Sequence, residues 1–331
     1  MTQVGEYTFT ITDGTCTEII KQSLAAAVQP PTPTIDAITN VTCFNAADGT
    51  ISVSVLDNGI DPYVFQITDR DGTAIVINPT SSNATSAEFT GLANTVGAGY
   101  TITVTGSNNC STTVVQTISQ PAAAVAISAP VVSEFDCTSG NATNYATIDL
   151  TGLVTGGSNS YVRYVFVNDA TPGTPVQDGS NSIYTETNVV GGNYTITVYD
   201  DMGCSASTTA SIAPFVGISA PTVVLVDPVT CNGNDEEITV GVTISPASAT
   251  PNLSYVVTGP NSYNQTINST NTSENFAGLG IGNYVITITN TDTGCRLTTR
   301  HLVSDPKVIE VTAVKATDET CLNDSVNGGS F

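Results

Sequence analysis

One strand pattern recurs four times along the chain at nearly constant spacing, and it constrains the fold more than any other feature. The pattern begins at Tyr7, Tyr100, Tyr194 and Tyr284, so the steps between copies are 93, 94 and 90 residues. Each tyrosine follows a glycine by one or two residues and opens a run in which bulky and polar side chains alternate. Such alternation predicts a strand with one buried face, and a fixed period of this length predicts an array of similar domains.

A turn, a cysteine and a second alternating run follow each tyrosine strand, as they do after Tyr194. This order predicts a β-hairpin. A glycine and a tyrosine at the start of such a strand resemble the tyrosine corner of immunoglobulin-like sandwiches, in which the ring is buried and the hydroxyl bonds back to the preceding loop. We predict this structural role for the four tyrosines; a buried tyrosine in an ordinary hairpin is the alternative.

The composition favours a chain made of strands. Thr, Ser, Val, Ile, Asn and Gly dominate, and long runs of Leu, Glu, Lys and Ala are missing, which argues against helices. Each period holds about seven candidate strands, the number expected for a two-sheet sandwich. The predicted fold class is therefore all-β, with tandem immunoglobulin-like β-sandwich domains in an elongated head-to-tail array.

Proline-containing junctions divide the chain into repeats. Proline cannot donate to a strand ladder and stiffens the backbone, and it ends the three full repeats at Pro121, Pro214 and Pro306. We expect the sequence to be a piece of a longer polypeptide, because it starts late in one repeat and stops early in another. The predicted segments are the hairpin of a truncated repeat (1–30), repeat 1 (31–121), repeat 2 (122–214), repeat 3 (215–306) and the first strand of a truncated repeat (307–331).

Repeat 1 carries the motifs of a known repeat family. They are Cys43-Phe44-Asn45, Asp48-Gly49-Thr50-Ile51, Pro62-Tyr63, Gly91-Leu92, Tyr100-Thr101-Ile102-Thr103-Val104, Cys110 and Gln120-Pro121. Together they resemble the SprB-type repeat of giant secreted adhesins of gliding Bacteroidetes. The resemblance implies a type IX-secreted, surface-exposed filament of immunoglobulin-like domains used in adhesion and gliding motility. The chain departs from the family in having no Trp, and repeat 2 has Asn144-Tyr145 in place of Asp-Gly.

Eight cysteines in a chain of this kind predict an oxidising compartment and a disulfide framework. No Cys-x-x-Cys motif is present, which argues against metal binding. In each full repeat one cysteine follows the first strand and another follows the last hairpin turn. The positions are Cys16, Cys43, Cys110, Cys137, Cys204, Cys231, Cys295 and Cys321.

Three pairing arrangements deserve comparison. A bond inside one repeat, such as Cys43–Cys110, would join opposite ends of a sandwich, roughly 33 Å apart for a ten-residue strand, whereas bridged Cα atoms lie within about 7 Å. A second arrangement joins cysteines across each junction and requires a tight chain reversal there. Its pairs are Cys16–Cys43, Cys110–Cys137, Cys204–Cys231 and Cys295–Cys321.

The third arrangement joins the first-strand end of one domain to the last hairpin of the next. It gives Cys43–Cys204 and Cys137–Cys295, fits a straight array, and is the one we favour. The remaining four cysteines, Cys16, Cys110, Cys231 and Cys321, would then pair with further domains. Free buried thiols are the alternative to any of these bonds.

Charge and residue types exclude several function classes. A net charge of −22 with only seven Lys plus Arg cannot supply the many phosphate contacts of a nucleic-acid partner. A catalytic triad needs a positioned base, yet His301 is the only histidine and repeats 1 and 2 have none. We therefore expect no enzyme activity. No apolar stretch of about 18 residues that could span a membrane is present.

Calcium is the one ion that the acidic loops suggest, because it takes several oxygen ligands. The best candidates are Asp69–Gly72 and Asn234–Glu237, but neither has EF-hand spacing, and we expect no cofactor. The function we predict is a disulfide-stapled, load-bearing stalk segment of a bacterial cell-surface adhesin, located outside the cell. Its expected partners are neighbouring repeats, surface glycans or other filament chains. The alternative function is a carbohydrate- or Ca²⁺-dependent binding module.

Overall fold

The computed structural model describes residues 3–26, 29–58, 60–230 and 234–306. Antiparallel strands make up the regular structure of these residues, in which the one helical element is a single 3₁₀ turn, η1 (Pro260–Ser262). The all-β prediction is confirmed. Cys231 and the predicted strand at 307–331, which includes Cys321, lie outside the described residues.

The described residues divide into two compact units. The first comprises residues of Met1–Val131, Asp149–Tyr184 and Tyr194–Ala210, and the second comprises residues of Val132–Ile148, Thr185–Asn193 and Ser211–Phe331. The division runs through repeat 2, so each unit combines one full repeat with part of repeat 2. Strands β3–β10 lie within residues 31–121, strands β11–β19 within 122–214 and strands β20–β26 within 215–306.

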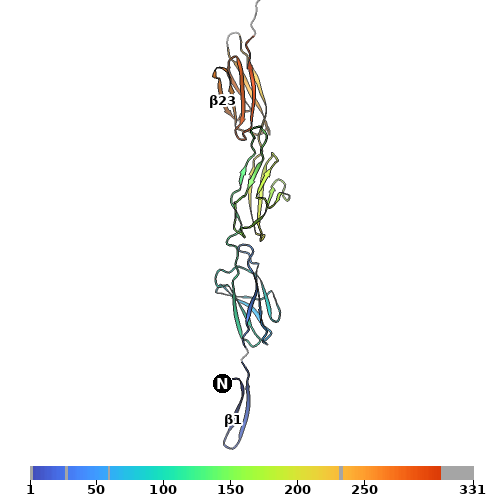
Figure 1. The fold of residues 1–331 in the computed structure, drawn as a ribbon, viewed down its shortest axis with the longest axis vertical. Coiled ribbons are helices and arrows are strands. Elements are labelled where there is room, and N and C mark those ends of the chain that lie inside the picture. Colours follow the sequence, from blue (N-terminus) through green and yellow to red (C-terminus); the bar gives the residue numbers. More distant parts are fainter. Residues whose placement is uncertain (1–2, 27–28, 59, 231–233, 307–331) are drawn as a thin grey trace, which may run out of the picture. The chain divides into compact units, whose positions relative to one another are not determined.

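In the first unit, an antiparallel hairpin precedes a sandwich of two four-stranded sheets (Figure 1, dark blue to cyan). The hairpin is β1 (Gly5–Thr12) with β2 (Thr17–Leu24). One sheet has the order β3-β4-β8-β7 and the other β10-β9-β5-β6. Their bounds are β3 (Pro33–Thr39), β4 (Gly49–Val55), β5 (Val64–Arg70), β6 (Thr73–Ile77), β7 (Ser81–Ser82), β8 (Ser86–Leu92), β9 (Tyr100–Thr105) and β10 (Ser111–Gln116).

Strand alternation builds the core of this sandwich. In β4 the side chains of Ile51, Val53 and Val55 are buried, while the serines between them lie closer to solvent. Phe65 on β5 and Phe89 on β8 are buried in the same cluster. Apolar area removed from water stabilises by about 25 cal/mol per Å², so the period-two pattern read from the sequence is also what holds the two sheets together.

Repeat 2 contains a four-stranded sheet of order β16-β15-β18-β19 and two smaller sheets, β11-β14 and β12-β13-β17. Phe166 on β15 and Ile196 on β18 are fully buried. The bounds are β11 (Ala126–Ile127), β12 (Val131–Ser133), β13 (Ala146–Asp149), β14 (Val154–Thr155), β15 (Tyr161–Asn168), β16 (Pro175–Gly179), β17 (Ile183–Glu186), β18 (Gly192–Asp200) and β19 (Ser205–Ile212).

Repeat 3, in the second unit, is a sandwich of a three-stranded sheet, β20-β21-β24, and a four-stranded sheet, β23-β22-β25-β26 (Figure 1, where β23 is labelled). Ile238, Tyr255, Phe276 and Ile286 are fully buried between the sheets. The bounds are β20 (Gly217–Asp227), β21 (Glu236–Ser245), β22 (Leu253–Thr258), β23 (Asn264–Ser269), β24 (Ser273–Leu279), β25 (Gly282–Asn290) and β26 (Arg296–Val303).

The repeated tyrosines occupy equivalent places. Tyr100, Tyr194 and Tyr284 lie near the starts of β9, β18 and β25 with buried rings, whereas Tyr7 on β1 is half-buried. The hydroxyl of Tyr100 donates to the carbonyl of Ala93 at 3.0 Å. The hydroxyl of Tyr284 donates to the Gly280 carbonyl at 2.9 Å, and that of Tyr7 to the Gln3 carbonyl. In these three copies the hydroxyl bonds back to the preceding loop.

Candidate functional site: two disulfide joints

Two disulfides connect successive repeats, and each lies within one compact unit. Cys43–Cys204 spans 161 residues with its Cα atoms 5.6 Å apart, and Cys137–Cys295 spans 158 residues with its Cα atoms 4.8 Å apart. These pairs join the first-strand cysteine of one repeat to the last-hairpin cysteine of the next, not cysteines across a junction. We call them the first and second joints. Among the described cysteines, Cys16 and Cys110 are free, exposed thiols.

A buried carboxylate organises the hairpin tip of the first joint. Asp200 is 2 % exposed. Its Oδ1 accepts the N–H groups of Met202 at 3.1 Å and Cys204 at 2.8 Å, and its Oδ2 accepts the N–H of Ser158 at 2.9 Å. Its own N–H donates to the Cys204 carbonyl at 2.9 Å. Charge-assisted hydrogen bonds of this kind are the stronger ones, so the turn holds the Cys204 backbone in one position.

The other half of the first joint is the loop that carries Cys43, which we call the exit loop (Thr42–Asp48). The Asp48 carboxylate accepts the N–H of Thr42 at 3.1 Å and also its hydroxyl. The Thr42 side-chain hydrogen bond holds the pKa of Asp48 below its usual value. The N–H of Ala46 donates to the Cys43 carbonyl at 2.9 Å and so closes a tight turn. The N–H of Asn45 donates to the side-chain carbonyl of Gln120 at 2.8 Å, so the loop is attached to the last residues of its own repeat.

In the second joint, backbone and side-chain hydrogen bonds accompany the disulfide. The N–H of Cys137 donates to the Thr293 carbonyl at 2.7 Å. The Asn141 amide pairs with the backbone of Arg296 in both directions: it donates to the Arg296 carbonyl and accepts the Arg296 N–H at 2.8 Å. Hydrogen bonds therefore pair two segments that are more than 150 residues apart in the sequence, and the disulfide lies beside these bonds.

The linker before β20 also contributes to the second joint. The rings of Phe135 and Phe215 meet edge to face with centroids 6.3 Å apart, a favourable aromatic geometry. The side chain of Asn290 is fully buried and donates to the Val216 carbonyl at 2.8 Å. The N–H of Ala213 donates to the Glu134 carboxylate at 2.8 Å. The linker is thus held on one side by the segment before Cys137 and on the other by the hairpin that carries Cys295.

The acidic loops proposed for calcium use their carboxylates internally. Asp71 accepts the N–H groups of Val96, Gly97 and Gly99, each at 2.9 Å. The bonds from Val96 and the two glycines, with the nearby Arg70, hold the pKa of Asp71 below its usual value. Asp69 accepts the Gly72 N–H at 2.9 Å, as expected of a hairpin turn. Across the part of the chain that the structure describes, no three potential metal ligands cluster.

The lone histidine has a structural partner. His301 on β26 lies with Nε2 in hydrogen-bond contact with the Glu236 carboxylate on β21. The Glu236 side chain is 8 % exposed and that of His301 is 21 % exposed. Glu236 belongs to the second acidic segment considered for calcium. Its carboxylate is the most buried one of that segment, and it is already paired with His301.

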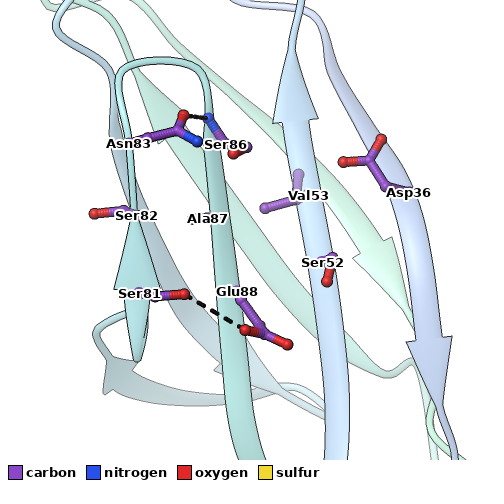
Figure 2. A pocket seen from close by; sticks show the side chains of 9 residues that line it. All are labelled: Asp36, Ser52, Val53, Ser81, Ser82, Asn83, Ser86, Ala87 and Glu88. Carbon is purple, nitrogen blue, oxygen red and sulfur yellow. Dashed lines mark hydrogen bonds between the residues drawn. The ribbon is translucent and has the colours of Figure 1, made fainter.

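A shallow polar groove of about 410 Å³ lies on the sheet β3-β4-β8-β7 of repeat 1. Figure 2 shows Asp36 on β3 and Glu88 on β8 beside it, with the Ser81 hydroxyl donating to Glu88 at 3.4 Å. Its other polar lining residues are serines and Asn83, and no aromatic side chain lines it. The groove offers hydroxyl and carboxylate groups but no flat apolar surface on which a sugar ring could stack.

Comparison with protein families identifies part of the chain. Residues 35–72 match the family model described as the SprB repeat. The chain contains a SprB repeat. The matched segment runs from β3 to the turn after β5 and includes the exit loop of the first joint. The match supports a repeat region of the kind found in cell-surface adhesins, in a protein at the cell surface or outside the cell. No curated protein matched the chain.

Several solved multidomain structures are similar to the chain at low identity. Three N-terminal domains of the outer capsid protein Hoc of bacteriophage RB49 are 13% identical, with 81% of this chain and 97% of that chain covered and a TM-score of 0.39. A Ca²⁺-stabilized ice-binding adhesin of an Antarctic bacterium is 14% identical, with 89% and 79% covered and a TM-score of 0.36. A tetra-tandem repeat from the extending region of a large adhesion protein is 16% identical, with 90% and 80% covered and a TM-score of 0.27. Within the described residues, no helix has the length and apolar character needed to cross a membrane.

Proposed function

We propose that this chain is a load-bearing stalk segment of a secreted bacterial surface adhesin that serves attachment and gliding motility. The SprB repeat supports the adhesin assignment. The observation that carries the mechanical role is the bonding of each repeat to the next through Cys43–Cys204 and Cys137–Cys295. A stalk needs length, strength and resistance to unfolding, and covalent bonds between repeats supply the last two.

The two disulfides interlock along the chain, because Cys137 lies between Cys43 and Cys204 while Cys204 lies between Cys137 and Cys295. Three polypeptide segments therefore connect one disulfide to the other. They contain 94 residues (Cys43 to Cys137), 67 residues (Cys137 to Cys204) and 91 residues (Cys204 to Cys295). Tension applied at the ends of the chain is shared among three parallel covalent connections in this region.

The bonds also oppose unfolding without force. In the chain-entropy model, closing a loop of about 160 residues stabilises the folded state by about 5 kcal/mol, a value at the upper end of the measured range.

Cell attachment under flow tests this proposal. Cells that produce the parent protein are labelled with an antibody to this segment while intact, and their attachment is measured at increasing shear. We expect surface labelling, and detachment at lower shear when Cys43, Cys204, Cys137 and Cys295 are all replaced by serine. Attachment that is independent of these cysteines at every shear would contradict the load-bearing role, and the absence of surface labelling would contradict the location.

The polar groove of repeat 1 gives the second candidate, a carbohydrate- or Ca²⁺-dependent binding module. Asp36 and Glu88 flank it, and carboxylate and hydroxyl oxygens are groups that calcium accepts as ligands. Calorimetry of the chain with calcium, and with glycans in the presence and absence of calcium, tests this candidate. Stoichiometric heat that disappears in Glu88→Ala would favour it over a stalk without ligands.

A further inference from the structure

The four-stranded sheet of repeat 3 differs in charge from the rest of the chain. None of its strands, β22, β23, β25 and β26, contains an aspartate or a glutamate. Among the residues that the structure describes, every other sheet of three or four strands contains at least one. The whole chain has 29 Asp plus Glu and only seven Lys plus Arg, yet β26 alone carries Arg296 and Arg300. This sheet is therefore a positively charged region of a strongly acidic chain.

Both arginines lie on the outer face of the sandwich. Strand β26 alternates, so that Leu297 packs against the core whereas Arg296, Thr298 and Arg300 are exposed. The sheet order is β23-β22-β25-β26, which places them on an edge strand. Residues four positions apart on a strand are separated by about 13 Å. One side of the sheet thus presents two guanidinium groups along the same edge.

Polar side chains cover most of the remaining outer face. The register pairs Arg296 with Thr289 on β25, and Thr289 with Ser254 on β22. At the far edge, β23 exposes Asn264, Thr266 and Asn268. We call the outward side chains of residues 254–258, 264–268, 285–289 and 296–300 the arginine face. Hydroxyl and amide groups, which both donate and accept hydrogen bonds, therefore extend from the arginines across the whole sheet.

The equivalent sheets of repeats 1 and 2 each contain one arginine, and in both the charge is neutralised. Arg70 on β5 lies with Nε 3.8 Å from the Asp71 carboxylate. Arg163 on β15 donates to both oxygens of the Asp178 carboxylate, at 2.7 and 2.8 Å. The chain therefore pairs its arginines with its own acidic residues where the ligand of the guanidinium group is internal.

The arginines of repeat 3 have no such partner. Within the described part of the chain, neither Arg296 nor Arg300 forms an ion pair with a carboxylate. The acidic residue in the tip between β25 and β26, Asp292, accepts the backbone N–H and the side-chain amide of Asn252, each at 2.9 Å. The Asn141 amide holds the backbone of Arg296. One guanidinium group thus extends from a fixed backbone, and both are available to a ligand.

We propose that the arginine face binds acidic glycans, with glycan carboxylates on the guanidinium groups of Arg296 and Arg300. The guanidinium fork matches the geometry of a carboxylate, and the rows of hydroxyl and amide groups suit sugar hydroxyls. A second copy of the chain is disfavoured as the occupant, because it would bring a further net charge of −22. The groove of repeat 1, flanked by Asp36 and Glu88, would repel the same ligand. The proposal goes beyond the stalk role, since it gives the segment a lateral attachment of its own.

Calorimetry of the full, disulfide-bonded chain with an oligogalacturonate tests the proposal, because this probe carries a carboxylate on each sugar. Its methyl ester is the matched probe, with the same sugar backbone and no charge. We expect the chain to bind the acid and not the ester, with affinity that falls as salt is added. Replacing both arginines, Arg296→Gln with Arg300→Gln, should raise Kd for the acid about tenfold.

The matched control is Arg70→Gln with Arg163→Gln, which removes the same charge from arginines that are already paired. We expect its Kd to equal that of the parent, and chemical denaturation shows that both double variants are folded. No heat with the acid, equal binding of the ester, or the same loss of affinity in both double variants would overturn the proposal. Sedimentation of the unliganded chain is the last test. Self-association that Arg296→Gln with Arg300→Gln abolishes would identify a second copy as the occupant and also overturn it. The load-bearing role is independent of these results, because attachment under shear tests it through the cysteines.

Discussion

Removing the two disulfides singly and together should change the extensibility of the chain in a strongly non-additive way. With both bonds intact, the shortest covalent path between Cys43 and Cys295 crosses each disulfide and the 67 residues from Cys137 to Cys204. Without Cys43–Cys204 the path is the 94 residues from Cys43 to Cys137, and without Cys137–Cys295 it is the 91 residues from Cys204 to Cys295. Without either bond it is the full 252 residues from Cys43 to Cys295.

These path lengths convert directly into distances. An extended residue spans about 3.3–3.6 Å. Loss of the first joint alone should lengthen the fully unfolded chain by about 90 Å, and loss of the second alone by about 80 Å. Loss of both should lengthen it by about 640 Å, nearly four times the sum of the single effects. Either disulfide alone therefore prevents most of the lengthening between Cys43 and Cys295.

Single-molecule force spectroscopy measures these lengths. The chain is tethered at its two ends and stretched until no folded structure remains, and the total contour length is read from the last part of the force curve. The variants are Cys43→Ser with Cys204→Ser, Cys137→Ser with Cys295→Ser, and all four together. Serine at the remaining four cysteines in every sample prevents stray bonds, and the four-serine variant of the joints should match the fully reduced parent.

Additive lengthening would refute the interlocked connection. If each single removal released about half of the total, roughly 320 Å, the two disulfides would act independently and not as an interlocked pair. A parent chain that already stretches to the reduced length would mean that neither bond forms. Only interlocked pairs give two small increments and one large one.

Three further predictions concern single residues. Asp200→Ala leaves three N–H groups of the first joint without an acceptor, each costing about 1–3 kcal/mol; we expect the potential of Cys43–Cys204 to become less negative by about 60 mV or more, with Cys137–Cys295 unchanged as the internal reference in a glutathione titration. Tyr100→Phe removes the hydrogen bond to the Ala93 carbonyl and should lower the stability of repeat 1 by about 1 kcal/mol in chemical denaturation, and an unchanged midpoint would contradict the tyrosine-corner role. The lowered pKa of Asp71 means that its stabilising effect is complete above the unfolded-state pKa of about 4 and is lost as pH falls through the lower folded value; Asp71→Asn should therefore flatten the acid limb of a stability–pH curve measured between about pH 2 and 5.

The fold was predictable because its signal is local and repeated. The alternating runs after Tyr100 and Tyr284 specify a strand with one buried face wherever they occur, and their period specifies how often the domain is copied. Ile51, Val53 and Val55 are buried as the alternation requires. The division into compact units was not predictable from the prolines, because compactness depends on contacts made by loops such as the one at Cys137, which bonds to a cysteine 158 residues away.

The contacts that shape the joints were harder to read from the sequence. Asn141 and Arg296 meet across 155 residues, and nothing in either local sequence marks the partner. Phe135 and Phe215 pack against each other where the linker enters repeat 3, and neither local sequence indicates this contact. Such contacts exist only once two loops have been brought together, so they carry no periodic signal.

A signal for the hairpin tips was present, however, six residues after each tyrosine. Asp13, Asp200 and Asn290 stand there, and Gly106 does so in repeat 1. A tight turn leaves several N–H groups pointing inward, and a short side chain with an oxygen acceptor satisfies them. Where glycine replaces that side chain, Asn108 two residues later accepts the cysteine N–H instead. A cysteine that must meet a sulfur on another repeat needs a fixed backbone, because the two Cα atoms must come within about 7 Å. The capping side chain of Asp200 therefore contributes to the first joint together with Cys204, because it accepts the Cys204 N–H and fixes the backbone that carries the sulfur.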